Sequence, residues 1–178
     1  MKIVMLEGSP HRYGSSNSLA AEFAAGARDV GHEVTEFKVA QMVIHPCFGC
    51  GHCQMDGPCF YDDDMSMSIR SAILAADMVV FVTPIYYFMM SAQMKAVIDR
   101  FYSFTLKLSA KHLKSALIAA AWDSEKDVMT CIEAYYNTLC SYMNFENKGM
   151  VLGLGCGTPA ETRASRYMRD AYELGAKL

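Results

Sequence analysis

The sequence contains no uninterrupted apolar run approaching the roughly 18 residues that a membrane-spanning helix requires. Its opening segment, MKIVMLEGSP, reaches Glu7 and Gly8 after too few apolar residues for a secretory signal. Basic residues are scarce as well: 16 lysines and arginines stand against 19 acidic residues, no basic run occurs, and the formal charge is −3. We therefore expect a cytoplasmic protein that binds neither membranes nor nucleic acid.

Two common phosphate-binding signatures are also missing. The chain has no Gly-x-Gly-x-x-Gly and no Gly-Lys-Ser/Thr of a Walker A loop, which disfavours a dinucleotide or ATP cradle of those types. It has no linker, no repeat and no low-complexity tract. Residues 1–178 are therefore predicted to form a single α/β domain, with a cysteine-rich loop at about 45–62.

The sequence does contain a regular alternation of strand and helix patterns. The expected strands are 2–6, 32–40, 78–84, 115–122 and 148–155, and the expected helices are 16–31, 66–77, 91–104, 125–143 and 159–178. In the first helix, Leu19, Phe23, Ala27 and Val30 fall on one apolar stripe. This alternation predicts a doubly wound, five-stranded parallel sheet of order 2-1-3-4-5 in a three-layer α/β/α arrangement.

Ligands of such sheets bind beyond the carboxyl ends of the strands, where the strand order reverses. Two turns should meet there, Glu7–Ser18 and Thr83–Ser91. The first is rich in glycine and serine and runs into a helix N-terminus, so it is either a phosphate cradle or an ordinary capped turn. The second carries Tyr86, Tyr87 and Phe88, whose rings would either stack on a planar ligand or cap the core.

Four of the seven cysteines are crowded into one short segment with the spacing Cys-x2-Cys-x2-Cys-x5-Cys. They are Cys47, Cys50, Cys53 and Cys59. The first three are spaced as in cluster-binding ferredoxin runs, whereas zinc sites favour two separated Cys-x2-Cys pairs. An iron–sulfur cluster is the favoured interpretation, and free or redox-active thiols and a zinc site stay open. The isolated Cys131, Cys140 and Cys156 are expected to be buried thiols.

These segments resemble a known family. The turn GSPHRYGSSNSL resembles the G-S-P-R-x-x-G-N-T-x-x-L turn of the flavodoxin-like NADPH-dependent FMN reductases, and TPIYYFMMSAQMKAVIDR is similar to that family's second signature. The similarity spans the whole chain. Within the family, the cysteine spacing followed by acidic residues 62–64 resembles the iron–sulfur flavoproteins, in which a compact cysteine motif holds a [4Fe-4S] cluster near FMN.

The resemblance implies roles for three groups of residues. The FMN phosphate would be held by Ser9, His11, Arg12, Ser15, Ser16 and Asn17. The isoalloxazine ring would be lined by Pro84, Ile85, Tyr86, Tyr87 and Phe88, and a third flavin-facing loop would supply Ala121, Trp122 and Asp123. Two positions depart from the family pattern. His11 stands where arginine is usual, so that His11 or Arg12 would meet the anion, and Ser15-Ser16 replaces Asn-Thr, which keeps the hydroxyls and loses the amide.

The resemblance also implies an FMN-dependent oxidoreductase with NAD(P)H as cosubstrate. Electrons would pass between NAD(P)H or a protein donor, FMN, a [4Fe-4S] cluster and an acceptor, either a small-molecule redox substrate or a ferredoxin-like protein. No catalytic side chain is assigned, because the flavin performs the redox step. Two alternatives stay open: a cluster-free NAD(P)H-dependent FMN or quinone reductase, and a non-enzymatic electron carrier or metal-binding module.

Further expectations concern the assembly and single positions. The family's habit of pairing subunits implies a homodimer or homotetramer, in which the cysteine loop of one subunit would serve its partner's FMN. The loop follows the second strand and is expected at the carboxyl edge of the sheet, on the flavin side. Trp122 either faces the flavin or fills the core, and Asp99 and Arg100 are expected to be a structural or interface pair on a surface helix.

Overall fold

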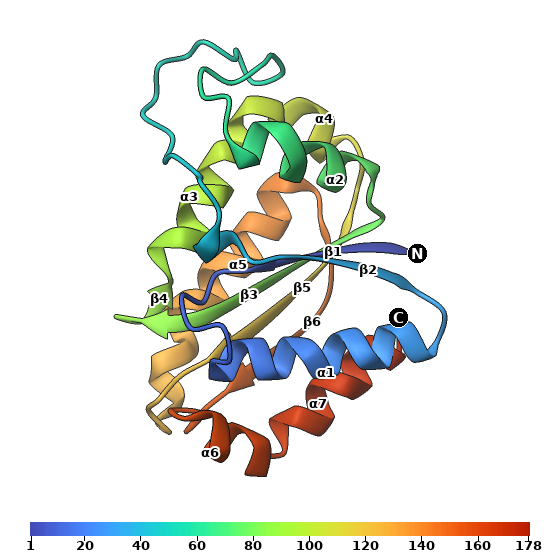
Figure 1. Cartoon of the computed structure of the whole chain (residues 1–178), viewed down its shortest axis with the longest axis vertical. Coiled ribbons are helices and arrows are strands. Elements are labelled where there is room, and N and C mark those ends of the chain that lie inside the picture. Colours follow the sequence, from blue (N-terminus) through green and yellow to red (C-terminus); the bar gives the residue numbers. More distant parts are fainter.

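A parallel sheet runs through the centre of the computed structural model, which describes all 178 residues (Figure 1). Its strands lie in the order β2–β1–β3–β5–β6, which confirms the predicted order 2-1-3-4-5 of the five principal strands. Their bounds are β1 (Lys2–Glu7), β2 (Glu33–Phe37), β3 (Met78–Tyr86), β5 (Lys114–Ala120) and β6 (Glu146–Gly153). The short β4 (Met89–Met90) was not predicted; it pairs antiparallel with the end of β3 and forms a protruding hairpin.

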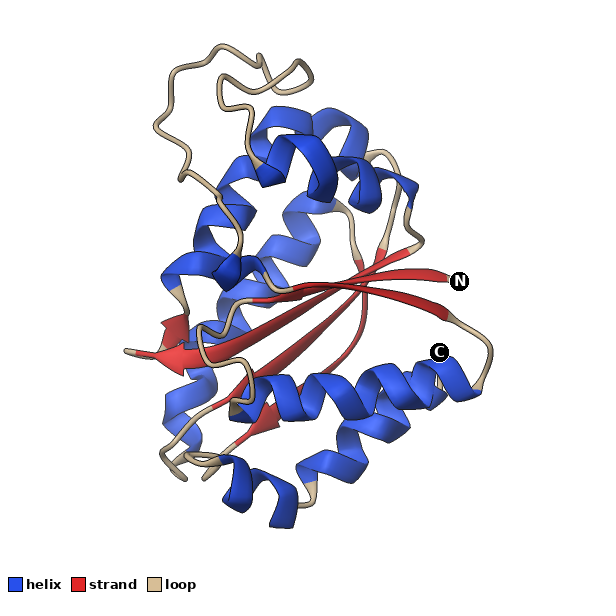
Figure 2. Ribbon diagram, in the orientation of Figure 1, coloured by secondary structure: helices blue, strands red, loops and turns tan.

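Helices cover both faces of this sheet, which confirms the three-layer α/β/α arrangement (Figure 2). One face carries α1 (Ser15–Asp29), α6 (Pro159–Ala164) and α7 (Tyr167–Ala176), and the other carries α2 (Arg70–Ala75), α3 (Ala92–Arg100), α4 (Thr105–Ser109) and α5 (Thr130–Met143). Strand β1 sends Ile3 and Met5 into one buried cluster and Val4 and Leu6 into the other. Apolar side chains on both faces of one strand explain its uninterrupted apolar run.

The helices α1 and α7 approach each other closely through two glycines. A Cβ atom at Gly26 would lie 2.1 Å from the Tyr172 carbonyl oxygen, and one at Gly175 would lie 2.2 Å from the Phe23 carbonyl oxygen. Neither contact is possible for a side chain. The glycines therefore let the C-terminal helix pack directly against the helix that begins at the first predicted ligand turn.

The predicted final helix, residues 159–178, is two helices. A capping box at Thr158 starts α6, since the Thr158 hydroxyl accepts the Glu161 N–H and the Glu161 carboxylate accepts the Thr158 N–H. The helix ends at Ser165, whose backbone is extended and whose hydroxyl accepts the N–H of Tyr167 at 3.3 Å. Serine competes with the helix for backbone hydrogen bonds in this way. The prediction of one continuous helix was therefore wrong, although the apolar pattern continues across Ser165.

Single positions also depart from the predictions. Val30 is 48% exposed instead of buried, because it lies just beyond the end of α1. Cys131 is exposed on the solvent side of α5, whereas Cys140 and Cys156 are buried as predicted. Helix α2 is preceded by a π-helical turn at residues 65–69. None of the helices has the length and apolar character that crossing a membrane requires.

Candidate functional site

Three loops at the carboxyl edge of the sheet and the end of strand β3 line a cavity of about 590 Å³. The loops are β1–α1, β5–α5 and β6–α6. The volume is within the range of about 300–1,000 Å³ that is usual for small-molecule and cofactor sites. The lining residues are Ser9, His11, Arg12, Tyr13, Gly14, Ser15, Ser16, Pro84, Ile85, Tyr86, Ala120, Trp122, Cys156, Gly157, Thr158 and Pro159.

The N-terminus of α1 opens into this cavity. Gly14 occupies the N-cap position with an extended backbone and has no side chain to cap the helix. The N–H groups of Ser15, Ser16 and Asn17 therefore have no acceptor within the helix. The Ser16 hydroxyl is buried and also has no hydrogen-bond partner. An unpaired hydroxyl among free N–H groups at the positive end of a helix fits a bound phosphate.

Ser9 and Asn17 shape the turn that precedes this helix. Ser9 Oγ accepts the His11 N–H at 3.2 Å, and Asn17 Nδ2 donates to the carbonyls of His11 at 3.3 Å and Arg12 at 3.4 Å. A Cβ atom at Gly14 would lie 3.0 Å from Ser9 Oγ, so a larger residue would require the neighbouring side chains of the turn to shift. Of the six residues assigned to the phosphate, only Asn17 does not line the cavity; it supports the turn from outside.

The β3–β4 hairpin forms the second wall. Pro84, Ile85 and Tyr86 line the cavity, whereas Tyr87 and Phe88 form the tip of the hairpin and do not. Tyr87 is 97% exposed, and both tip residues have left-handed backbone angles, with φ of +47° and +68°. The aromatic segment is therefore divided between the cavity and the protein surface, and it does not cap the core.

A buried serine joins the two predicted ligand turns. Ser91 Oγ donates to the Gly8 carbonyl at 2.7 Å, and the Ser91 N–H donates to Thr83 Oγ1 at 2.9 Å. The same hydroxyl accepts the Met94 N–H and so caps α3. These bonds fix the end of β1 against the hairpin and the start of α3.

Trp122 and residues 156–159 close the remaining side. Trp122 lines the cavity and is 84% exposed, so it does not fill the core. Its neighbours do not line the cavity: Ala121 is buried, and the Asp123 carboxylate accepts the Glu125 N–H at 3.0 Å. The wall at 156–159 was not predicted. The glycine-rich GLGCGTP after the last strand could have indicated it, because that strand ends at the same edge of the sheet.

Glu7 was also not identified from the sequence as a candidate site residue. It ends β1, is 4% exposed, and lines a neighbouring cavity of about 290 Å³ that shares Arg12 with the first. Burial and the nearby charge of Glu36 raise the pKa of Glu7 to about 7, although Lys38 acts in the opposite direction. Glu7 therefore exchanges its proton near neutral pH. An acidic residue at the end of an apolar strand was the available signal.

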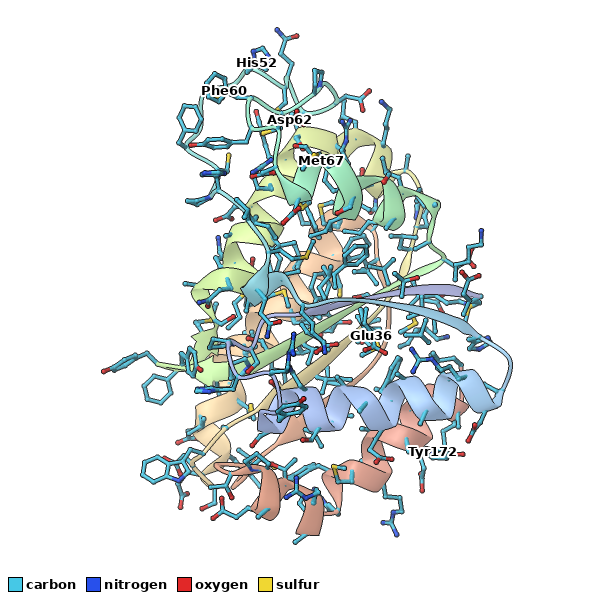
Figure 3. All side chains as sticks on the ribbon, viewed as in Figure 1. Glu36, His52, Phe60, Asp62, Met67 and Tyr172 are labelled. Carbon is cyan, nitrogen blue, oxygen red and sulfur yellow. The ribbon has the colours of Figure 1, made fainter.

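The cysteine loop lies apart from the large cavity. It leaves the carboxyl end of β2 and rises beyond α2 and α4, on the face of the sheet opposite α1 (Figure 1). Figure 3 places His52 and Phe60 on its outer part. The loop starts at the predicted edge, but the cysteine hollow shares no lining residue with the cavity. Within one chain, the prediction that the loop lies on the flavin side was wrong.

Within the loop, all four cysteines line one small hollow of about 20 Å³. Cys53 is 7% exposed, Cys59 is half-buried, and Cys47 and Cys50 are exposed. No three histidine, cysteine or acidic side chains converge closely enough to hold a metal ion. The geometry therefore disfavours the zinc interpretation, since a structural zinc ion needs four ligands around one point.

A four-iron cluster makes a different demand on its ligands. Each thiolate binds a different iron, so the four sulfurs stand farther apart than the ligands of a single ion. Residues 45–52 are exposed throughout, and nothing surrounds Gly49 or Gly51, whose φ angles are +75° and +71°. Phe48 of this arm packs against Phe60 and Tyr61, with ring centres 5.6 and 5.5 Å apart, so a cluster would require these contacts to open and the arm to move outward. The donor set fits a cluster on that condition.

A buried ion pair holds the loop on the domain. Asp63 accepts two N–H groups of Arg100 at 2.7 and 3.0 Å, and their side chains are 3% and 1% exposed. Although burial acts to raise the pKa of Asp63, hydrogen bonds from Arg100 and His45 lower it to about 2. Arg100 has the expected structural role, but it points inward instead of lying on the surface, and Asp99 pairs with Lys95 and not with Arg100.

Comparison with known proteins identifies the family. The family model of NADPH-dependent FMN reductases matches residues 1–145. An iron–sulfur flavoprotein of Archaeoglobus fulgidus is 28% identical over 180 residues, which cover 100% of this chain and 79% of that protein. An iron–sulfur flavoprotein of Methanocaldococcus jannaschii is 26% identical over 137 residues, which cover 77% of this chain and 70% of that protein.

Solved structures share the flavodoxin-like fold. The NAD(P)H:quinone oxidoreductase from Methanothermobacter marburgensis has a TM-score of 0.77 at 18% identity, over 99% of this chain and 95% of that one. The FMN-dependent NADH-azoreductase from Bacillus anthracis, in complex with FMN, has a TM-score of 0.71 at 14% identity, over 99% of both chains. The family model covers most of the chain and the α1 terminus fits a phosphate. The chain therefore belongs to the NADPH-dependent FMN reductase family, as an FMN- and NAD(P)H-dependent oxidoreductase.

Proposed function

We propose that this oxidoreductase is an iron–sulfur flavoprotein that passes electrons between NAD(P)H or a protein donor, FMN and an acceptor. The acceptor would be a small-molecule redox substrate or a ferredoxin-like protein. The observation that carries the proposal is that all four cysteines of one loop line a single hollow, in a chain that also has the cavity at the carboxyl edge. Relatives named iron–sulfur flavoproteins support it.

The phosphate of FMN would lie at the N-terminus of α1. There the Ser16 hydroxyl and the free N–H groups of Ser15 and Ser16 would gain the acceptor that they lack. Hydrogen bonds to a charged group are worth about 1.5–3 kcal/mol each. His11 and Arg12 are both exposed at the rim, where either side chain can reach the outer phosphate oxygens.

The isoalloxazine ring would lie between the segment 84–86 and Trp122. When bound, FMN supplies the redox chemistry, because it accepts electrons from NAD(P)H and releases them to the acceptor. The chain would hold the ring and would leave one side accessible to the nicotinamide. Gly157 makes room for Trp122, since a Cβ atom there would lie 1.8 Å from Trp122 Cδ1.

The four cysteines would hold the [4Fe-4S] cluster through thiolates supplied by Cys47, Cys50, Cys53 and Cys59. Cys53 is buried and Cys59 is half-buried, whereas Cys47 and Cys50 lie on the exposed arm. The turn after Cys53 is fixed, because its carbonyl accepts the N–H groups of both Asp56 and Gly57. We infer that the inner pair is in place before the cluster binds and that the outer pair closes over it.

A second candidate is a cluster-free NAD(P)H-dependent FMN or quinone reductase. The observation that favours it is the size of the hollow, which has room for about one water molecule. In this case the four cysteines would stay free thiols. The two candidates agree on FMN and differ only in the content of the loop.

We also propose a homodimer, or a homotetramer built from it. The hairpin tip exposes Tyr87 and Phe88, and the cavity wall beside this hairpin exposes Trp122, all large apolar side chains. Clustered exposed apolar surface of this kind is typical of protein interfaces. In such an assembly the cysteine loop of one subunit would exchange electrons with the FMN of its partner. The cluster and the flavin would then lie close together across the interface, although the hollow and the cavity are apart within one chain. A monomeric mass by light scattering would contradict the assembly.

One anaerobic experiment separates the candidates. The protein is purified without oxygen, and FMN, iron and acid-labile sulfide are measured per chain. Four irons and four sulfides with one FMN would support the iron–sulfur flavoprotein; FMN without iron, even after reconstitution, would support the reductase. Stopped-flow reduction by NADH and by NADPH then identifies the donor. A protein that cannot be loaded with FMN would contradict both candidates.

A further inference from the structure

The buried guanidinium of Arg100 has one donor without a partner. Of the five N–H groups of arginine, the two on Nη1 donate to the His45 carbonyl at 2.8 Å and to Asp63 Oδ2 at 2.7 Å. The two on Nη2 donate to Asp63 Oδ1 at 3.0 Å and to Ser66 Oγ at 3.1 Å. The fifth, on Nε, has no acceptor, although Arg100 is 1% exposed. Buried donors are rarely left unpaired in folded proteins, so an acceptor is missing here.

Arg100 forms part of the wall of the cysteine hollow. It lines the hollow together with all four cysteines, and it is the only charged residue that does so. Its guanidinium also packs over the ring of Tyr61, 5.4 Å from the ring centre, which fixes its plane. The other side chains around the hollow are mostly aromatic and offer no competing cation.

Cys59 lines the same hollow as Arg100 and lies two residues before Tyr61, whose ring and carbonyl both contact Arg100, so its sulfur is the candidate acceptor. Burial acts to lower the pKa of Arg100, but Asp63 raises it, and Cys59 makes a smaller contribution in the same direction as Asp63. Because Asp63 already balances the charge of Arg100, the pair is close to neutral as a whole. Arg100 therefore offers Cys59 the dipole of its Nε–H group and little net charge.

We propose that Arg100 is a positioning residue of the cysteine site, whose Nε–H donates to the Cys59 sulfur when that sulfur is a cluster ligand and thereby raises the cluster's reduction potential. The inference rests on the proposed [4Fe-4S] cluster. The reduced cluster carries one more electron than the oxidised cluster, so its sulfurs are better hydrogen-bond acceptors. A hydrogen bond to a ligand sulfur therefore stabilises the reduced form more and shifts the potential upward.

The substitution Arg100→Lys tests the hydrogen bond separately from the charge. Lysine keeps a positive charge and can still pair with Asp63, but its single ammonium group cannot also donate from the Nε position. Protein reconstituted with iron and sulfide is titrated with dithionite, and the reduced cluster is followed by electron paramagnetic resonance. We expect the preference for the reduced form to weaken roughly tenfold, which lowers the midpoint potential by about 59 mV.

Two further variants test the direction of the shift in reduction potential and provide a control. Asp63→Asn keeps the Nε donor and removes the balancing negative charge, so the potential should rise. Lys95→Met removes a positive charge from the same helix, at a side chain that does not line the hollow, so the potential should stay unchanged. FMN content and thermal unfolding report folding. Since the two test variants have opposite expected signs, either one that folds is informative.

The outcomes distinguish this inference from the proposed function. A purely structural role would reduce cluster retention in both variants without moving the potentials in opposite directions. An unchanged or raised potential in Arg100→Lys, or an unchanged or lowered one in Asp63→Asn, overturns the role of Arg100 and leaves the cluster in place. Wild-type protein that takes up no iron or sulfide overturns the proposed function and this inference with it.

Discussion

The cavity at the carboxyl edge and the hollow in the cysteine loop are built in different ways. The cavity is framed by the ends of a helix and several strands, and sheet and helix hydrogen bonds hold its walls in place. The loop has one short helical turn, Val39–Gln41, between β2 and residue 65, and side chains hold it on the domain. The cavity walls are therefore anchored at both ends in regular secondary structure, whereas the hollow depends on a few contacts.

Two buried carboxylates show the same difference. Glu7 lies beside the cavity and faces Glu36, and burial with that like charge raises its pKa to about 7. Asp63 lies under the loop and faces Arg100, whose hydrogen bonds outweigh burial and lower its pKa to about 2. Burial acts to raise both pKa values, and only Asp63 has hydrogen-bond donors that reverse the direction. Acid should therefore weaken the anchor of the loop, and alkali should weaken the surroundings of the cavity.

The largest expected effect is the loss of the cluster from the cysteine loop without any change in FMN binding at the cavity. In Cys50→Ser, iron and sulfide per chain should fall by roughly tenfold or more, because serine is a poor ligand for iron. FMN content should stay unchanged, since the hollow and the cavity share no residue. Cys131→Ser, an exposed cysteine outside the loop, is the matched control. Joint loss of FMN and iron would show that the two sites depend on each other.

The next effect concerns the anchor of the loop. Arg100→Met leaves Asp63 buried without a partner and should lower the free energy of unfolding by about 3–5 kcal/mol. Adding Asp63→Leu should restore most of this loss, because the double variant buries no charge. Urea unfolding measures both, and limited proteolysis should show cleavage within residues 45–62. Arg169→Met breaks an exposed pair on α7 and should have no measurable effect. Equal stability of all variants would contradict an anchoring role.

The sequence predicted the framework of the cavity because that framework follows local rules. Apolar runs with covered faces gave the sheet order, and the two turns at the strand ends do meet across Ser91 and Gly8. Motif spacing could not show which side chains of a turn face inward. Tyr86 lines the cavity while Tyr87 points away from it, because β4, only two residues long, turns the chain at that point.

The position of the cysteine loop could not be predicted from local sequence patterns, because long-range contacts determine it. Asp63 and Arg100 are 37 residues apart, and no periodicity relates them. The pattern on α3 suggested an exposed end for this helix, but the last residue turns inward to a partner that only the folded loop supplies. The cysteine spacing did indicate a common hollow. It gave no information on the course of the loop, which depends on contacts with α3 and α4.

A smaller effect should appear in the pH dependence of stability. The pKa of Glu7 is about 7 in the folded protein, against an ordinary value of 4.5. Between these values the folded chain retains a proton that the unfolded chain has released, so stability falls as pH rises from about 4.5 to 7. Glu7→Gln should remove this fall and gain roughly 3 kcal/mol at pH 8, because one pKa unit corresponds to about 1.4 kcal/mol.

Urea unfolding of wild type and Glu7→Gln at several pH values between 5 and 8 measures this difference. Glu36→Gln should flatten the curve in part, since the charge of Glu36 is one cause of the raised pKa. The contribution of Asp63 is present above its unfolded pKa of about 4 and is lost as the pH falls from there towards 2, so it lies outside the measured range. Parallel curves for wild type and Glu7→Gln would contradict the assignment.

The smallest expected effect tests whether the cavity is built for an anion. Ser16→Ala should weaken FMN binding by about 1–2 kcal/mol, or roughly 5–30-fold in Kd, because a hydrogen bond to the phosphate is lost. The FMN-free protein should be as stable as wild type or more stable, since the Ser16 hydroxyl is buried without a partner. Ser18→Ala is the matched control, because that hydroxyl donates to the Gly14 carbonyl on the same helix.

This prediction is specific because Ser16→Ala should weaken FMN binding without lowering the stability of the FMN-free protein. A serine that merely stabilised the helix would lower stability when replaced, with or without FMN, as Ser18 is expected to do. A serine held for a ligand stabilises only the loaded protein, so the effects on binding and on FMN-free stability should separate. Fluorescence titration with FMN and thermal unfolding of the FMN-free protein measure the two quantities. Destabilisation of the FMN-free Ser16→Ala protein would show that the hydroxyl already has a structural partner and that the free donors of α1 are not, by themselves, a phosphate site.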